Sequence, residues 1–84
     1  MLHIYVAEHC PGSPTAQIRA ARLRERAPEI PVAVVDIGAP GAVVPPAVFG
    51  TPTYTWNDRI IFLGNPSDQE LLERARSLHE RPAP

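Results

Sequence analysis

The chain has 84 residues, of which 44% are hydrophobic and 20% are charged, and this balance is typical of a globular domain. A chain of this length has room for one core, and a net charge of -1 gives no electrostatic footprint for nucleic acid or an anionic membrane. No apolar run reaches the roughly 20 residues that a membrane span needs. The first residues also lack the basic start of a secretory signal. We therefore expect a cytoplasmic monomer with no nucleic-acid or membrane partner.

The first part of the chain has the pattern of a strand, a helix and a second strand. Residues 2–7 are rich in β-branched and aromatic residues and predict a strand, which residues 8–12 then break. A helix is expected from about Pro14 to Ala27, with Ser13 as its N-cap. The apolar run at residues 30–37 predicts an interior strand that is covered on both faces. The two strands should be parallel and joined by a right-handed crossover.

The second part of the chain begins with a connector at residues 38–50, whose glycines and prolines allow at most one helical turn. Residues 51–56 and 59–63 are strand-like runs, and they flank Asn57-Asp58, a dipeptide that favours the positive φ angles of a tight turn. These runs predict an antiparallel hairpin. Ser67, three residues before a glutamate, forms a capping box that opens the last helix.

The expected order of elements is therefore β-α-β, a connector, and β-β-α. This order predicts an α/β fold in which helices pack on one mixed four-stranded sheet. Residues 1–80 should form a single domain, and residues 81–84 should form a disordered tail.

Two local patterns resemble the thioredoxin/glutaredoxin superfamily. The first is the strand that leads into Cys10-Pro11-Gly12-Ser13, which is similar to the C-P-x-C/S active-site loop of glutaredoxins and short thioredoxins. The second is Gly50-Thr51-Pro52-Thr53-Tyr54, which is similar to the family's cis-proline segment and is likewise followed by a hairpin and a glycine, Gly64. The resemblance covers nearly the whole chain. It implies a trimmed thioredoxin-like fold, because the connector is too short for the family's usual second helix.

The resemblance implies a monothiol thiol–disulfide oxidoreductase that acts through Cys10, with Ser13 at the place of the second, resolving cysteine. Protein disulfides or small thiols are then the expected partners, and glutathione or another low-molecular-weight thiol would serve as co-substrate. No resident cofactor and no metal are expected. The catalytic residues would be Cys10 and Ser13, and the substrate-binding residues would be His9, Pro11, Gly12, Thr51 and Pro52, the last of them in cis.

Activation of the thiol depends on where Cys10 lies relative to the first helix. The partial positive charge of a helix N-terminus stabilises a nearby thiolate, a protonated His9 would help, and Glu8 would oppose it. Ser13 precedes a proline, and a residue in that place avoids helical angles, so the helix should start after Ser13. Cys10 would then lie outside the first turn, and we expect its pKa to be lowered only modestly.

Two other functions remain open. The domain could be a non-catalytic module that binds a protein partner through the Thr51–Pro52 edge or the connector, with Cys10 as an inert thiol. It could also be a glutathione or iron–sulfur carrier, which would need two chains to supply enough ligands. Ala7 and Asn65 weaken the carrier, because glutaredoxins commonly have a lysine and a glycine at these positions.

Several other residues have a plainer structural interpretation. Ser13 is first a helix cap, and His9 is a solvated loop residue. His3 and His79 have no companions at metal-ligand spacing. A solvated helix flank is expected for Arg19, Arg22 and Arg26, and hairpin packing for Tyr54, Trp56 and Phe62.

Overall fold

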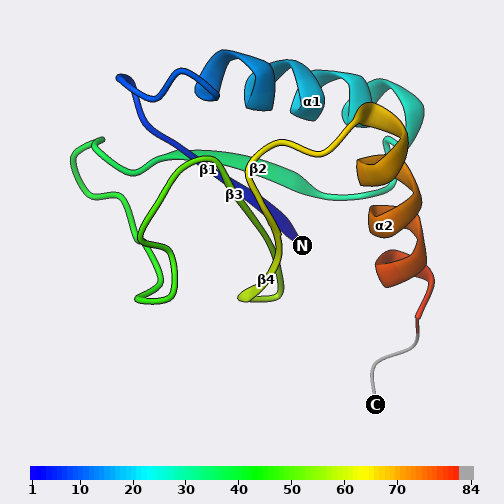
Figure 1. The fold of residues 1–84 in the computed structure, drawn as a ribbon. Helices are drawn as coiled ribbons and strands as arrows, with labels where there is room; N and C mark the ends of the chain where they lie inside the picture. The colour runs from blue at the N-terminus through cyan, green and yellow to red at the C-terminus, as the bar shows by residue number, and fades with distance from the viewer. Residues whose placement is uncertain (82–84) are drawn as a thin grey trace.

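A computed structural model describes residues 1–81, so the expected tail lies, apart from Arg81, outside the described residues. The elements follow in the expected order, β1 (Leu2–Val6), α1 (Ser13–Arg26), β2 (Val32–Asp36), β3 (Thr53–Trp56), β4 (Arg59–Leu63) and α2 (Asp68–Glu80) (Figure 1). Within this range no helix is long and apolar enough to cross a membrane.

The four strands form one mixed sheet in the order β2-β1-β3-β4. β1 pairs with β2 in parallel and with β3 antiparallel, and β3 and β4 form an antiparallel hairpin. Asn57 and Asp58 have φ angles of 48° and 69°, which are the positive values expected for this turn. The α/β architecture is confirmed, and it is compatible with a trimmed thioredoxin-like fold.

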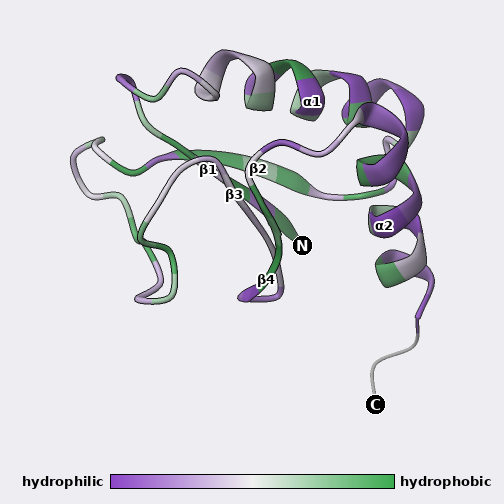
Figure 2. Ribbon diagram, viewed as in Figure 1, coloured by the Kyte–Doolittle hydropathy of each residue, from purple (hydrophilic) through white to green (hydrophobic). Residues whose placement is uncertain are grey.

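Both helices pack on the same face of the sheet and enclose the core there. Leu2, Ile4 and Val6 point to this face because alternate residues of a strand share a side, and all three are buried. They pack against α1, α2 and the hairpin, through Ala16, Ala20, Leu23, Leu71, Leu72, Ala75 and Tyr54. In Figure 2 the strands β1 and β2 are largely green, whereas both helices mix green and purple as amphipathic helices do.

On the other side of the sheet lies the connector between β2 and β3, away from α1 (Figure 1). It forms turns rather than a helix, one of them closed by the Val48 amide, which donates to the Pro45 carbonyl at 2.9 Å. Residues 32–35 of β2 are only half-buried on both faces of the sheet, because this strand lies at the edge. The prediction that this segment is an interior strand is therefore wrong. β2 is an edge strand, and β1 is interior.

The start of α2 is fixed by a capping box and by two arginines of α1. The Ser67 hydroxyl accepts from the Glu70 amide and the Glu70 carboxylate accepts from the Ser67 amide, each at 3.1 Å, as predicted. Asp68 forms ion pairs with Arg22 and Arg19. The prediction of a solvated arginine flank is thus wrong for Arg19, which is largely covered where α1 faces the N-terminus of α2, whereas Arg22 pairs with Asp68 and stays exposed.

Candidate functional site

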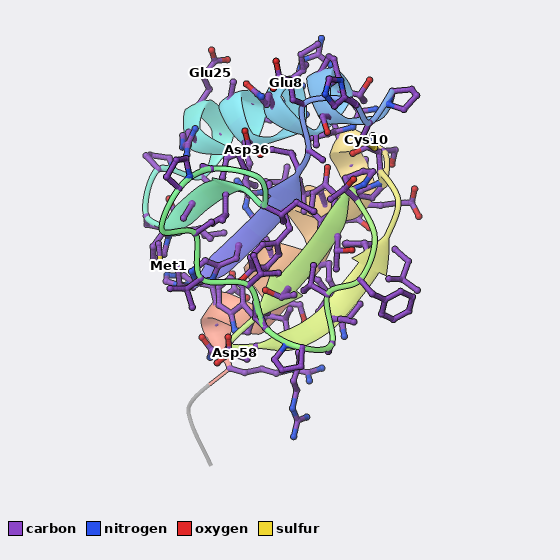
Figure 3. The ribbon with its side chains drawn as sticks, turned by 90° about the vertical axis from the view of Figure 1, so that its left-hand side faces the viewer. Met1, Glu8, Cys10, Glu25, Asp36 and Asp58 are labelled. Carbon is purple, nitrogen blue, oxygen red and sulfur yellow. The ribbon has the colours of Figure 1, made fainter. Side chains whose placement is uncertain are left out.

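Cys10 lies in the loop between β1 and α1, at the edge of the sheet where its two parallel strands end. Two turns shape this loop: the Cys10 amide donates to the Ala7 carbonyl at 3.1 Å, and the Ser13 amide donates to the Cys10 carbonyl at 3.0 Å. The cysteine is a free thiol and is partly exposed. Figure 3 shows it at the end of the molecule where this loop passes over the start of β3.

The Thr51–Pro52 segment faces Cys10 directly. The Cys10 thiol donates to the Thr51 carbonyl at 3.1 Å across 41 positions of sequence, and the Thr51–Pro52 peptide bond is cis, as expected. Gly12 packs so close to the proline ring that a Cβ at this position would lie 3.0 Å from the Pro52 Cδ. The fold therefore brings together four of the predicted site residues, Cys10, Gly12, Thr51 and Pro52.

Asn65 joins the two loops of the site, and the sequence did not predict this role. Its side-chain Nδ2 donates to the Gly12 carbonyl at 2.9 Å, and its Oδ1 accepts from the Tyr54 hydroxyl at 2.7 Å. Tyr54 is fully buried, and this burial raises the pKa of its phenol to about 12. In the sequence, the only signal for this role was the position of a polar residue between a glycine that ends a strand and a proline. The contact itself could not be predicted, because Gly12 lies 53 positions away.

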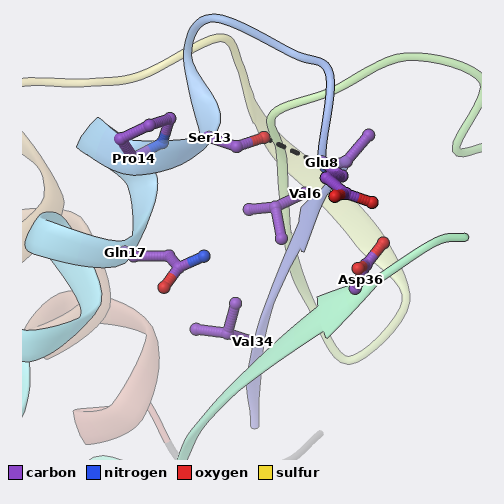
Figure 4. Close-up of a pocket in the computed structure, with 8 residues that line it drawn as sticks. Val6, Glu8, Ser13, Pro14, Gln17, Val34 and Asp36 are labelled. Atoms are coloured by element: carbon purple, nitrogen blue, oxygen red, sulfur yellow. Dashed lines mark hydrogen bonds between the residues drawn. The ribbon is translucent and has the colours of Figure 1, made fainter. Parts of the chain in front are cut away.

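Ser13 does not cap α1. Gly12 occupies the N-cap position and α1 begins at Ser13, whose hydroxyl turns back to accept from the Ala7 amide at 3.0 Å (Figure 4). The N-cap prediction is therefore wrong, because the serine side chain joins the loop to the end of β1 instead of to the next turn of the helix. Its oxygen is occupied by Ala7, but its hydrogen can still be donated toward the sulfur of Cys10.

Several hydrogen bonds hold the pKa of the Cys10 thiol below its ordinary value. The largest contribution comes from the Thr51 side chain and the next from the Gly12 backbone, with smaller ones from Ser13. Partial burial works in the opposite direction. The Thr51 carbonyl also favours the neutral thiol that donates to it. Together these effects lower the pKa of Cys10 and so favour the thiolate, which is the nucleophilic form.

The remaining two predicted residues, His9 and Pro11, lie next to Cys10 on the same loop and are exposed. Within residues 1–81 neither side chain forms a hydrogen bond. They therefore form part of the surface around the thiol, and their side chains do not stabilise the thiolate through hydrogen bonds.

Cavities lie on both sides of the site. One of about 350 Å³ lies between the first turn of α1 and the ends of β1 and β2, with the carboxylates of Glu8 and Asp36 at its rim (Figure 4). Another, of about 250 Å³, lies beside Thr51 and Pro52. In the part of the chain that the structure describes, no three histidine, cysteine or acidic side chains come together in a group that could hold a metal ion.

Comparison of the chain with protein-family models, with curated proteins and with solved structures found no match.

Proposed function

We propose that this chain is a thioredoxin-like, monothiol thiol–disulfide oxidoreductase that acts through Cys10. The observation that carries the proposal is the 3.1 Å contact between the Cys10 sulfur and the Thr51 carbonyl. This contact places a partly exposed thiol with a lowered pKa beside a backbone edge that can pair with an extended substrate. Disulfide exchange needs a thiolate that the substrate can reach and a site that binds the substrate backbone.

In the proposed reaction the Cys10 thiolate attacks one sulfur of a disulfide. The new bond to Cys10 forms as the substrate disulfide breaks, and the second substrate sulfur leaves as a thiolate that takes a proton from water. Ser13 has no sulfur, so the mixed disulfide cannot be resolved within the domain. A second thiol then attacks the substrate sulfur of the mixed disulfide, so that Cys10 leaves as a thiolate and the new disulfide joins this thiol to the substrate. The second thiol is glutathione, another small thiol or a protein thiol. A cytoplasmic setting would supply such thiols.

The residues around the sulfur have separate roles in this proposal. The Thr51 side chain, the Gly12 backbone and the Ser13 hydroxyl stabilise the thiolate. Asn65 is a positioning residue, because it holds the loop of Cys10 against the segment of Pro52. His9 and Pro11 form the surface that the partner approaches.

The rate at which Cys10 reacts with a small neutral aromatic disulfide at pH 7 tests this proposal. We expect it to react several-fold faster than an unstructured cysteine peptide, because a larger fraction of the thiol is ionised. Thr51→Val should slow the reaction, Thr51→Ser should preserve it, and Cys10→Ser should abolish it. A rate equal to or below that of the peptide would contradict the proposed oxidoreductase activity.

A non-catalytic binding module is the second candidate, and it is favoured by two large apolar side chains near the site. Phe49 is 90% exposed and Leu63 is 73% exposed. Exposed apolar groups that gather in one place often mark an interaction surface. A slow thiol together with tight, disulfide-independent binding of a partner would support this candidate over the enzyme.

A further inference from the structure

The cavity of about 250 Å³ beside Thr51 is bounded by segments that lie far apart in the sequence. Its walls come from the connector, the start of β3 and the end of β4, through Ala47, Phe49, Thr51, Pro52, Leu63 and Gly64 among others. None of the residues that line it is ionisable. The cavity is therefore an uncharged and largely apolar recess.

This recess is adjacent to the reactive thiol. Thr51 lines the recess, and its carbonyl accepts from the Cys10 sulfur at 3.1 Å. Any residue joined to Cys10 by a disulfide must lie beside Thr51. Its sequence neighbours then follow at about 3.8 Å between Cα atoms, so a flanking side chain reaches the recess. The covalent bond thus keeps the partner's neighbouring residue within reach of the recess.

We propose that this recess holds a large, uncharged apolar side chain next to the half-cystine of a peptide bound to Cys10. The inference rests on the proposed function and assigns its substrate class, apolar peptide disulfides in preference to glutathione. Phe49 and Leu63 are the specificity-determining residues, because their exposed side chains lie at this recess and lose contact with water when it is filled.

Glutathione fits this recess poorly because of its charges. It carries two carboxylates and one ammonium, whereas the recess offers no opposite charge, and burying an unpaired charge is costly. The chain has no lysine at all. Asp68, the acidic residue at the start of α2, already pairs with Arg22 and Arg19 and is not available for an ammonium group.

An exchange equilibrium tests the recess without depending on how fast Cys10 reacts. Cys10 is first converted into a mixed disulfide with the blocked tripeptide Ser-Cys-Ser and then equilibrated with the blocked tripeptide Leu-Cys-Leu. One disulfide and one thiol are present on each side, so the equilibrium constant reports only the difference between the flanking residues. The same pair exchanged on a small reference thiol corrects for intrinsic differences, and a parallel experiment uses glutathione as the competitor.

We expect the unaltered chain to favour the leucine peptide about tenfold, which is less than full burial of a leucine side chain would give because the recess is open on one side. Phe49→Ser and Leu63→Ser should each reduce the preference. Val43→Ser is the matched control, because Val43 is an equally exposed apolar residue of the same connector that does not line the recess.

Equal occupancy by the two peptides in the unaltered chain would overturn the inference, and so would a preference that both serine variants leave intact. Stronger retention of glutathione than of the leucine peptide would also overturn it. A slow reaction of Cys10 would count against the proposed enzyme alone, because the equilibrium constant does not depend on the rate.

Discussion

On the face of the sheet that α1 and α2 cover, Leu2 and Ile4 are completely buried. On the opposite face Tyr5 is buried as well, whereas Val35 of the edge strand β2 is only half-buried. That second face also carries Thr55, whose buried hydroxyl has no hydrogen-bond partner among the described residues.

One face of the sheet is closed by two amphipathic helices and the other by a connector rich in glycine and proline. The cluster of buried apolar side chains lies on the helix-covered face, which therefore supplies most of the stability. The candidate site lies beside the connector, where the apolar side chains of Phe49 and Leu63 remain exposed.

Truncation of one apolar residue on each face should give the largest difference. Ile4→Ala removes a fully buried side chain between the helices and should lower the free energy of unfolding by about 3 kcal/mol. Val35→Ala, on the strand partner of β1, should cost about 1 kcal/mol or less, because its site is partly solvated already. Urea unfolding of both variants measures the difference, and similar losses would show that the two faces are equally important.

Alkaline pH should weaken the helix-covered face through Tyr54. The pKa of its phenol is raised from 10.0 to about 12 in the folded chain. The folded state therefore retains a proton that the unfolded state loses, so this stabilisation is complete below pH 10 and is lost as the pH rises toward 12. The loss should amount to about 2 kcal/mol.

Unfolding measurements at pH 10 and pH 12 test this prediction against Tyr54→Phe. The phenylalanine variant should lose about 1 kcal/mol at neutral pH, because Asn65 then has no donor for its Oδ1, but it should show a smaller loss at high pH. The absence of lysine keeps other titrations in this range few. An identical pH dependence in both proteins would assign the alkaline loss to another group.

Thr55→Val should stabilise the protein by about 1 kcal/mol, because it replaces a buried hydroxyl without a partner by a methyl group of similar shape. Thr53→Val is the contrasting control on the same strand, since the Thr53 hydroxyl donates to the Gly50 carbonyl at 2.7 Å and its loss should destabilise. In thermal unfolding, Thr55→Val should raise the midpoint temperature and Thr53→Val should lower it. A destabilised Thr55→Val variant would indicate that the hydroxyl is hydrated and satisfied.

Most of the features that the sequence predicted correctly are local, and the approach of Cys10 to Pro52 was expected only from the family resemblance. Asn57-Asp58 specifies its own turn, and Ser67 and Glu70 are close enough in the chain to cap each other. The order of elements follows from such signals together with apolar periodicity. The α/β fold could therefore be derived before its contacts were known.

The features that the sequence missed depend on contacts that the local pattern does not specify. β2 has the composition of an interior strand, and only the pairing of β3 with the other side of β1 leaves it at the edge of the sheet. Ser13 looks like a helix cap until the loop brings its hydroxyl to Ala7. The roles of Asn65 and of Arg19 likewise depend on partners that the fold places beside them.

A pH titration of the Cys10 thiolate absorbance, in the unaltered chain and in Thr51→Val, tests whether this fold activates the thiol. Hydrogen bonds at the meeting of the β1–α1 loop with the Thr51–Pro52 segment should place the midpoint below the free-thiol value of about 8.5, and loss of the Thr51 hydroxyl should raise it. A midpoint at or above the free-thiol value, unchanged in Thr51→Val, would contradict the idea that this fold prepares one sulfur for exchange.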